Sequence, residues 1–212
     1  ELDRLATTYV PGPQNTVNAL CTGLGIPTTH LVTIDMAQFA TIIDSLGGIE
    51  VDVPEPVRDA YTGLNLSSAG RQRLSGIDAL ALVRSRHPEI LRNGTWVSMS
   101  QADGAQHRSQ STATVMQAVL SAIGQKASNP VSLHQLAHTV AGNITLDSGT
   151  GLADLVSLGR SASKAGRAGT TTVIDLPTGP RDESIIVSPN QESRDLLAGY
   201  GYTPKTCRPA GA

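Results

Sequence analysis

The part of the chain that most narrowly defines its architecture reads Leu74-Ser75-Gly76-Ile77-Asp78-Ala79-Leu80-Ala81-Leu82-Val83-Arg84-Ser85-Arg86-His87. Ser75 can cap a helix, because its side chain can accept a hydrogen bond from the first helical turn. The apolar side of that helix is made by Ile77, Leu80, Ala81 and Val83. Pro88 follows at once, and proline disfavours a helical conformation in the residue before it. We therefore predict a short helix that stops at two arginines, Arg84 and Arg86.

These two arginines are candidates for an anion site. If the chain becomes extended after the helix, side chains two residues apart point the same way. Each guanidinium can bind two oxygens at once, so a converging pair suits a phosphate or a pyrophosphate. The alternative is that Arg84 and Arg86 merely complement the helix dipole, and judged on these residues alone it is the commoner case. Both interpretations stay open at this point.

Helices and strands are predicted on both sides of this stretch. The predicted helices cover about 14–24, 36–46 (capped by Asp35), 103–125, 131–141, 150–164 and 190–199. The predicted strands cover 30–34, 49–53, 170–176 and 185–187. Residues 57–74 are predicted to be rich in turns, and 88–101 to form a loop. This order indicates an α/β (α+β) fold, with a mixed central β-sheet flanked by helices, in one domain over 1–212.

Composition excludes several classes of protein. The 212 residues are 39% hydrophobic, enough for a sizeable core, and no apolar run is long enough for a membrane helix. Lys and Arg total 16 against 18 Asp and Glu, so the chain lacks the basic surface of a nucleic-acid binder. No nucleophile elbow, phosphate loop, HExxH motif or zinc-binding spacing occurs. Six arginines between 71 and 108 favour a local anionic ligand instead.

Two cysteines, Cys21 and Cys207, lie near opposite ends of the chain. A bridge between them would close a very long loop, and two unrelated buried thiols are the alternative. Export from the cytoplasm would favour the bridge.

Three blocks of the sequence, in order, resemble the LytR-CpsA-Psr family. They run from His30 to Val51, from Val53 to Gly70, and from Leu74 to His87, and they contain the strings Asp44-Ser45-Leu46-Gly47-Gly48, Val53-Pro54-Glu55-Pro56 and Arg84-Ser85-Arg86-His87. Asn129-Pro130, Asp147 and Leu176-Pro177 resemble the C-terminal part of the family less tightly.

The resemblance implies a fold, a location and an activity. Family members are held by one upstream transmembrane helix and act on the extracytoplasmic face of the bacterial membrane. They transfer a glycopolymer from a polyprenyl-pyrophosphate carrier to peptidoglycan, form a phosphodiester, and use a divalent metal, usually Mg²⁺. Their lipid tail lies in an apolar tunnel. Carried over by position, Arg84, Arg86 and Arg108 would be catalytic, and His87 and Gln110 would join them in binding the substrate.

The sequence also departs from the family pattern. Ala102 and Ala105 stand where an Asp and an Arg are usual, although Asp103 could replace the acid. The metal-binding aspartates of the family and a further phosphate-binding arginine belong to strands upstream of residue 1 and have no match here. Either they precede this sequence in a longer protein or the protein lacks them. An alternative function is therefore non-catalytic binding of polyprenyl phosphates or wall polymer. A transcription regulator is a weaker alternative, because the net charge of the chain is near neutral and DNA-binding domains are usually basic.

Overall fold

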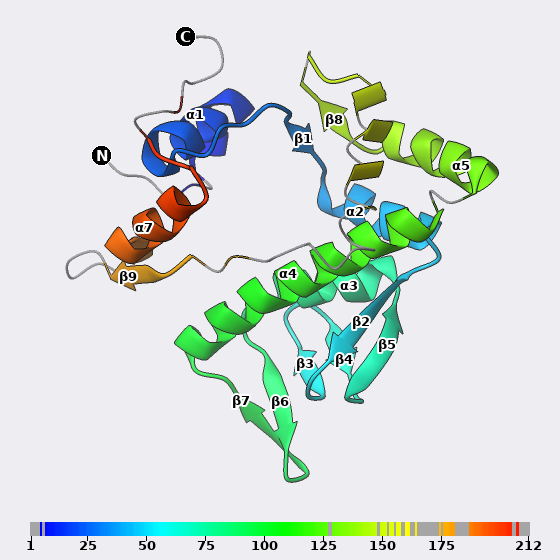
Figure 1. Ribbon diagram of the computed structural model, residues 1–212. Helices are drawn as coiled ribbons and strands as arrows, with labels where there is room; N and C mark the ends of the chain where they lie inside the picture. The colour runs from blue at the N-terminus through cyan, green and yellow to red at the C-terminus, as the bar shows by residue number, and fades with distance from the viewer. Residues whose placement is uncertain are drawn as a thin grey trace. The chain divides into compact units, whose positions relative to one another are not determined.

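The computed structural model describes residues 5, 7–126, 129–147, 149–151, 153–154, 156–157, 160–161, 164, 174, 176–180, 187–204 and 207. Its backbone contacts divide the chain into two compact units (Figure 1). The larger unit spans Val32–Val173, and the smaller unit combines Glu1–Leu31 with Ile174–Ala212.

The larger unit carries most of the secondary structure. Its elements are β1 (Val32–Thr33), α2 (Met36–Ser45), β2 (Ile49–Val53), β3 (Val57–Asp59), β4 (Leu64–Leu66), β5 (Gly70–Leu74), α3 (Gly76–Arg84), β6 (Glu89–Arg92), β7 (Thr95–Ser98), α4 (Gln101–Lys126), α5 (Pro130–Ala141) and β8 (Thr145–Leu146). The mixture of helices and antiparallel strands confirms the α+β class.

Local sequence signals explain where several of these elements begin. Asp35 and Gln38 form a reciprocal capping box at the start of α2, in which each side chain bonds the other residue's backbone N–H. Ser75 accepts a hydrogen bond from the Asp78 N–H and caps α3 as predicted. In β2, apolar residues are buried and the acidic residues between them are exposed, which confirms a half-exposed strand.

The strands of the larger unit pair antiparallel in the described chain. β2 pairs with β5, β1 with β8, and a four-stranded sheet has the order β4-β3-β6-β7. Two sequence expectations were wrong here. The segment 57–74 is not mainly turns, since it contains β3, β4 and β5, and the expected loop 88–101 contains the β6–β7 hairpin. Asn93 and Gly94 join that hairpin with φ of 50° and 77°, the positive values that a tight hairpin turn requires.

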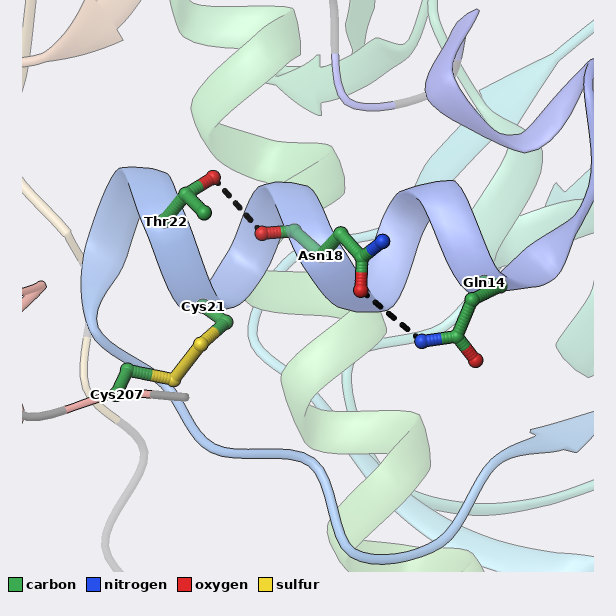
Figure 2. Close-up of a disulfide and its surroundings, with 5 residues drawn as sticks. All are labelled: Gln14, Asn18, Cys21, Thr22 and Cys207. Carbon is green, nitrogen blue, oxygen red and sulfur yellow. Dashed lines mark hydrogen bonds between the residues drawn. A yellow bond between two sulfur atoms is a disulfide. The ribbon is translucent and has the colours of Figure 1, made fainter. Parts of the chain in front are cut away.

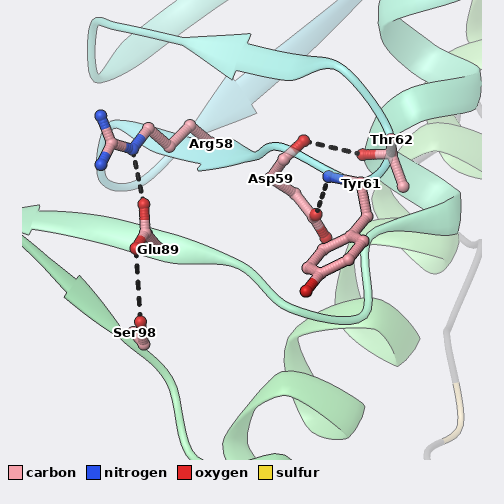
Figure 3. Close-up of polar contacts among 6 residues, drawn as sticks. All are labelled: Arg58, Asp59, Tyr61, Thr62, Glu89 and Ser98. Carbon is pink, nitrogen blue, oxygen red and sulfur yellow. Dashed lines mark hydrogen bonds and ion pairs between the residues drawn. The ribbon is translucent and has the colours of Figure 1, made fainter.

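The hairpin is fixed to β3 by a charged and aromatic cluster. The Nε of Arg58 donates to Glu89 at 2.6 Å, and Ser98 donates to the same carboxylate (Figure 3). The Arg58 guanidinium also lies 4.4 Å from the ring centroid of Trp96. This distance is within the range of a cation–π interaction.

A core of aliphatic side chains holds the larger unit together. Its most deeply buried members include Ile43, Ile49, Val57, Leu74 and Val115. The long helix α4 packs against α3 and β2, and α5 packs against α2 and α4 (Figure 1). α4 therefore forms one wall of the unit, and part of this helix lies beside the end of α3.

The helices α2 and α3 meet at a glycine. The backbone N–H of Gly76 donates to the Asp44 side chain at 2.7 Å. A side chain at this position would overlap the backbone of Ala40. Glycine at 76 is thus a requirement of the close contact between the two helices.

The smaller unit contains α1 (Pro13–Leu24), the 3-10 turn Thr7–Tyr9, β9 (Thr178–Pro180), β10 (Val187–Pro189) and α7 (Gln191–Gly199). Strands β9 and β10 pair antiparallel. Cys21 in α1 forms a disulfide with Cys207, with a Cα–Cα distance of 5.5 Å (Figure 2). The bridge confirms the first of the two alternatives for the cysteines.

The predicted strands at 170–176 and 185–187 lie largely outside the described residues. The predicted helix at 150–164 is described in part, and it is helical at 153–154, 156–157, 160–161 and 164. None of the helices in the described part of the chain has the length and apolar character that crossing a bilayer requires.

Candidate functional site

A hollow of about 400 Å³ lies where α3 ends. We call it the arginine pocket. It is lined by Met36, Asp59, Tyr61, Thr62, Val83, Arg84, Arg86, His87 and Arg108. Four of the five residues predicted to bind substrate therefore share one pocket.

The end of α3 places the first two arginines. Arg84 is the last residue of the helix, and Ser85 leaves it with φ −60° and ψ 122°, outside the helical region. Ser85 therefore provides the extended backbone between Arg84 and Arg86 that lets two side chains point the same way. Both arginines are exposed, so their charged ends are accessible to a ligand.

Helix α4 supplies the third arginine. Gly104, buried in its first turns, lies against the Arg86–Pro88 turn, and a Cβ there would stand 3.3 Å from the carbonyl oxygen of Arg86. This close approach lets α4 pass beside the end of α3. Arg108, one turn further along, is half-buried and lines the pocket.

The charges of these three arginines are not neutralised within the described chain. Arg58, Arg71, Arg73 and Arg92 each form an ion pair with a glutamate at 2.6–3.4 Å. No described carboxylate pairs with Arg84, Arg86 or Arg108. The pocket therefore concentrates positive charge that remains available to an anion.

Asp59 is the acidic residue of this pocket, and sequence reasoning missed it. It ends β3, is 1% exposed, and accepts hydrogen bonds from the residues that follow α3. Burial raises its pKa, but the hydrogen bonds from His87, Ser85, Tyr61 and Arg86 outweigh burial, so the pKa lies below the ordinary value for aspartate. Figure 3 shows the bond from the Tyr61 N–H at 2.9 Å.

The aromatic rings beside the arginines also pack together. The His87 and Tyr61 ring centroids are 4.8 Å apart at an interplanar angle of 48°. Tyr61 is otherwise open to solvent, with 83% of its surface exposed.

Gln110, the fifth predicted residue, lies apart from the arginine pocket. It lines two other hollows, of about 70 and 310 Å³, together with His107. Residues two apart on a helix face different sides, so Arg108 and Gln110 cannot both point into one pocket. Asp103 lines the second of these hollows and accepts a hydrogen bond from Ser100 at 2.6 Å.

A further hollow lies along one face of α4, and all of its described lining residues belong to this helix. This α4 groove has a volume of about 580 Å³ and is lined by Ala105, Arg108, Ser109, Thr112, Ala113, Met116, Gln117 and Leu120. Arg108 belongs to both the α4 groove and the arginine pocket. A pocket lined by positively charged side chains thus adjoins a groove with several apolar side chains.

The described residues do not fit a divalent metal. The carboxylate in the arginine pocket, Asp59, already accepts four hydrogen bonds. Among the described residues no three His, Cys, Asp or Glu side chains are grouped so as to hold a metal ion.

Comparison with known proteins assigns the chain to a family. A family model described as the LytR_cpsA_psr family matches residues 3–184. The chain belongs to the LytR-CpsA-Psr family. The resemblance seen in the sequence is confirmed.

Individual members of the LytR-CpsA-Psr family agree with this assignment. A solved structure of a LytR-Csp2A-Psr enzyme from Actinomyces oris is 94% identical, with a TM-score of 0.89 over 99% of this chain and 77% of that one. The crystal structure of TagV from B. subtilis shares the fold at 21% identity, with a TM-score of 0.68 over 95% of this chain and 76% of that one.

A curated relative adds a functional context. The cell wall biosynthesis protein LcpA of Corynebacterium glutamicum is 29% identical over 138 residues, which are 65% of this chain. The match spans only 24% of the length of LcpA.

Proposed function

We propose that this LytR-CpsA-Psr chain carries the site of a transferase that moves a cell-wall glycopolymer from a polyprenyl-pyrophosphate carrier to peptidoglycan. One observation supports this most strongly. Three guanidinium groups without a described carboxylate partner line one pocket, while four other arginines of the same unit are paired. The chemistry would take place on the extracytoplasmic side of the membrane, where the bridge between Cys21 and Cys207 would persist.

The arginine pocket suits the pyrophosphate of such a carrier. Arg84 ends α3, Arg86 lies in the turn that follows, and Arg108 lies on α4, so the three can approach a diphosphate from different sides. Guanidinium groups bind phosphate oxygens in pairs and remain charged at any physiological pH. The same groups would oppose the charge that builds on the phosphate oxygens during transfer.

The α4 groove suits the hydrocarbon tail of the carrier. It shares Arg108 with the arginine pocket, so a headgroup held by Arg108 would have its tail beside Ala105 and Met116. Ala105, which stands where the family usually has arginine, contributes an apolar surface to that groove. We propose that this groove is part of the lipid-binding tunnel expected from the resemblance.

The proposed reaction is a displacement at phosphorus. A hydroxyl oxygen of the peptidoglycan acceptor attacks the phosphorus that bears the glycopolymer, and its proton leaves to solvent. The bridging P–O bond of the pyrophosphate breaks, and polyprenyl phosphate departs with the electron pair. Orientation of the acceptor in line with this bond and charge stabilisation by the arginines would supply the catalysis.

The alternative function, binding without turnover, is favoured by two specific observations. The described residues offer no metal site, and Ala105 replaces an arginine of the family pattern. A domain with this pocket could hold polyprenyl phosphates or wall polymer for delivery.

An assay of the full-length protein with a lipid-pyrophosphate-linked glycopolymer separates the two functions. Turnover is measured at increasing Mg²⁺ concentrations. We expect transfer to peptidoglycan and release of polyprenyl phosphate. Arg84→Ala, Arg86→Ala and Arg108→Ala should each lower the rate by roughly 10²- to 10³-fold, as loss of one charge-stabilising donor does elsewhere.

Arg71→Ala is the matched control, because Arg71 is exposed and paired with Glu50 at 2.7 Å. It should keep the wild-type rate. Tight binding of the substrate with no turnover at any Mg²⁺ concentration would establish the binding function instead.

A further inference from the structure

A buried carboxylate organises the turn that carries the predicted site. Asp59 is 1% exposed, and its charged form is favoured although charged side chains are rarely buried. A buried charge is tolerated only where hydrogen bonds replace the lost water. The hydrogen-bond partners of Asp59 therefore show which part of the chain this carboxylate holds.

Three of the four partners lie consecutively in the chain. The Oδ2 atom of Asp59 accepts from the Ser85 hydroxyl at 2.8 Å, from the Arg86 N–H at 3.0 Å and from the His87 N–H at 2.9 Å. The segment 85–87 connects α3 to β6 and lies outside both elements. The Ser85 hydroxyl and the backbone N–H groups of Arg86 and His87 are thus held by one side chain that is 26–28 residues away in the sequence.

The same carboxylate leaves the neighbouring guanidiniums unpaired. Its Oδ1 atom accepts from the Tyr61 N–H at 2.9 Å, so both oxygens are engaged by backbone or hydroxyl donors. In the described chain neither the Arg84 guanidinium nor the Arg86 guanidinium donates to Asp59, which takes only the backbone N–H of Arg86. Asp59 can therefore fix the turn without consuming the charge that the pocket offers.

We propose that Asp59 is a positioning residue, which holds the turn 85–87 so that Arg86 and His87 face the arginine pocket. This inference rests on the proposed function, because it assumes that the pocket binds a pyrophosphate. Asp59 does not touch the substrate. Its effect on affinity passes through the backbone of Arg86 and His87.

The test compares two variants of β3 in the full-length protein. Asp59→Asn keeps the shape of the side chain but turns an NH₂ group or a weaker acceptor towards the donors of the turn. Val57→Ala, two residues earlier in the same strand, removes buried volume from a side chain that is 2% exposed and lies outside the arginine pocket. Both lower the melting temperature, but only Asp59→Asn should disturb the turn.

Two measurements are made well below both melting temperatures. Hydrogen exchange of the Arg86 and His87 amides, without ligand, should be fast in Asp59→Asn and slow in Val57→Ala and the wild type. Calorimetry with inorganic pyrophosphate should show an affinity about 10- to 100-fold weaker for Asp59→Asn, the size of effect expected from misplacing a site by about 1 Å. Val57→Ala should bind as the wild type does.

Each outcome bears on one of the two claims. A folded Asp59→Asn protein with wild-type pyrophosphate affinity, or an equal loss in Val57→Ala, overturns the positioning role. Wild-type protein that neither binds pyrophosphate nor turns over the lipid substrate overturns the proposed function, and the inference with it. If Asp59→Asn does not fold, Ser85→Ala keeps the carboxylate, removes one donor, and must weaken pyrophosphate binding in the same direction for the inference to stand.

Discussion

Gly76 and Ala40 are in direct backbone contact, with the first residue of α3 pressed against the carbonyl group of α2. A methyl group at 76 has no room unless the two helices separate. We predict that Gly76→Ala lowers the free energy of unfolding by about 3 kcal/mol, at the upper end of the usual cost of overpacking. Ile77→Ala is the control, because Ile77 is 72% exposed in the same helix turn. Equal stability of both variants in urea titrations would contradict the prediction.

Lysine at the three pocket arginines should separate charge from geometry. Arg84→Lys, Arg86→Lys and Arg108→Lys each keep the positive charge but lose the planar fork that binds two oxygens. We expect pyrophosphate affinity to fall by about tenfold in each, less than in the alanine variants, with calorimetry as the measurement. Arg92→Lys, at a side chain paired with Glu55 outside the pocket, should bind normally. Full affinity in all three variants would mean that the pocket offers charge alone.

His107 should make stability depend on pH. Burial lowers the pKa of His107, and the nearby Glu55 carboxylate raises it by less, so the folded protein holds the proton more weakly than the unfolded chain. The free energy of unfolding is then highest above the ordinary histidine pKa of about 6.5 and falls as the pH drops below it. We predict a smaller fall in His107→Gln between about pH 7.5 and 5, measured by denaturant titration. If the free energy of unfolding falls equally in His107→Gln and in the wild type, His107 does not contribute to the pH dependence of stability.

The disulfide should stabilise the smaller unit. Cys21 and Cys207 are 186 residues apart in the sequence. Closing so long a loop lowers the entropy of the unfolded chain and so raises its free energy by roughly 5 kcal/mol in the chain-entropy treatment. Cys21→Ser with Cys207→Ser should therefore lower the melting temperature markedly. Reducing agent should lower it for the wild type and not for the double variant. A wild-type melting temperature in the double variant would contradict this.

Local signals in the sequence predicted much of the fold correctly. The capping residues Asp35 and Ser75, the alternation in 49–53 and the proline at 88 each act within a few residues, so they can be recognised without tertiary contacts. The strands β3 and β4 have only three residues each, too short for a periodic pattern, and they form because they pair with each other. The Asn93-Gly94 pair is a usable hairpin signal, because both residues readily adopt the positive φ that a two-residue turn requires.

The candidate site was predictable only in part. Arg84, Arg86 and His87 are adjacent in sequence, so one motif located them all. Asp59 resembles an ordinary turn aspartate beside Arg58, because its partners at 85–87 are distant in the sequence. Gln110 was grouped with Arg108 by its position in the family motif, and the helical repeat of α4 separates the two.

The packing of Trp96 against Arg58 has a practical consequence for following the protein in solution. Trp96 is the single tryptophan of the chain, and its surroundings are the β6–β7 hairpin and β3. Its fluorescence therefore reports on this corner of the larger unit alone. A melting curve recorded by tryptophan fluorescence would not register separate loosening of the smaller unit, which holds three of the four tyrosines, Tyr9, Tyr200 and Tyr202. Their emission follows that unit once the signal of Tyr61, in the larger unit, is removed by Tyr61→Phe.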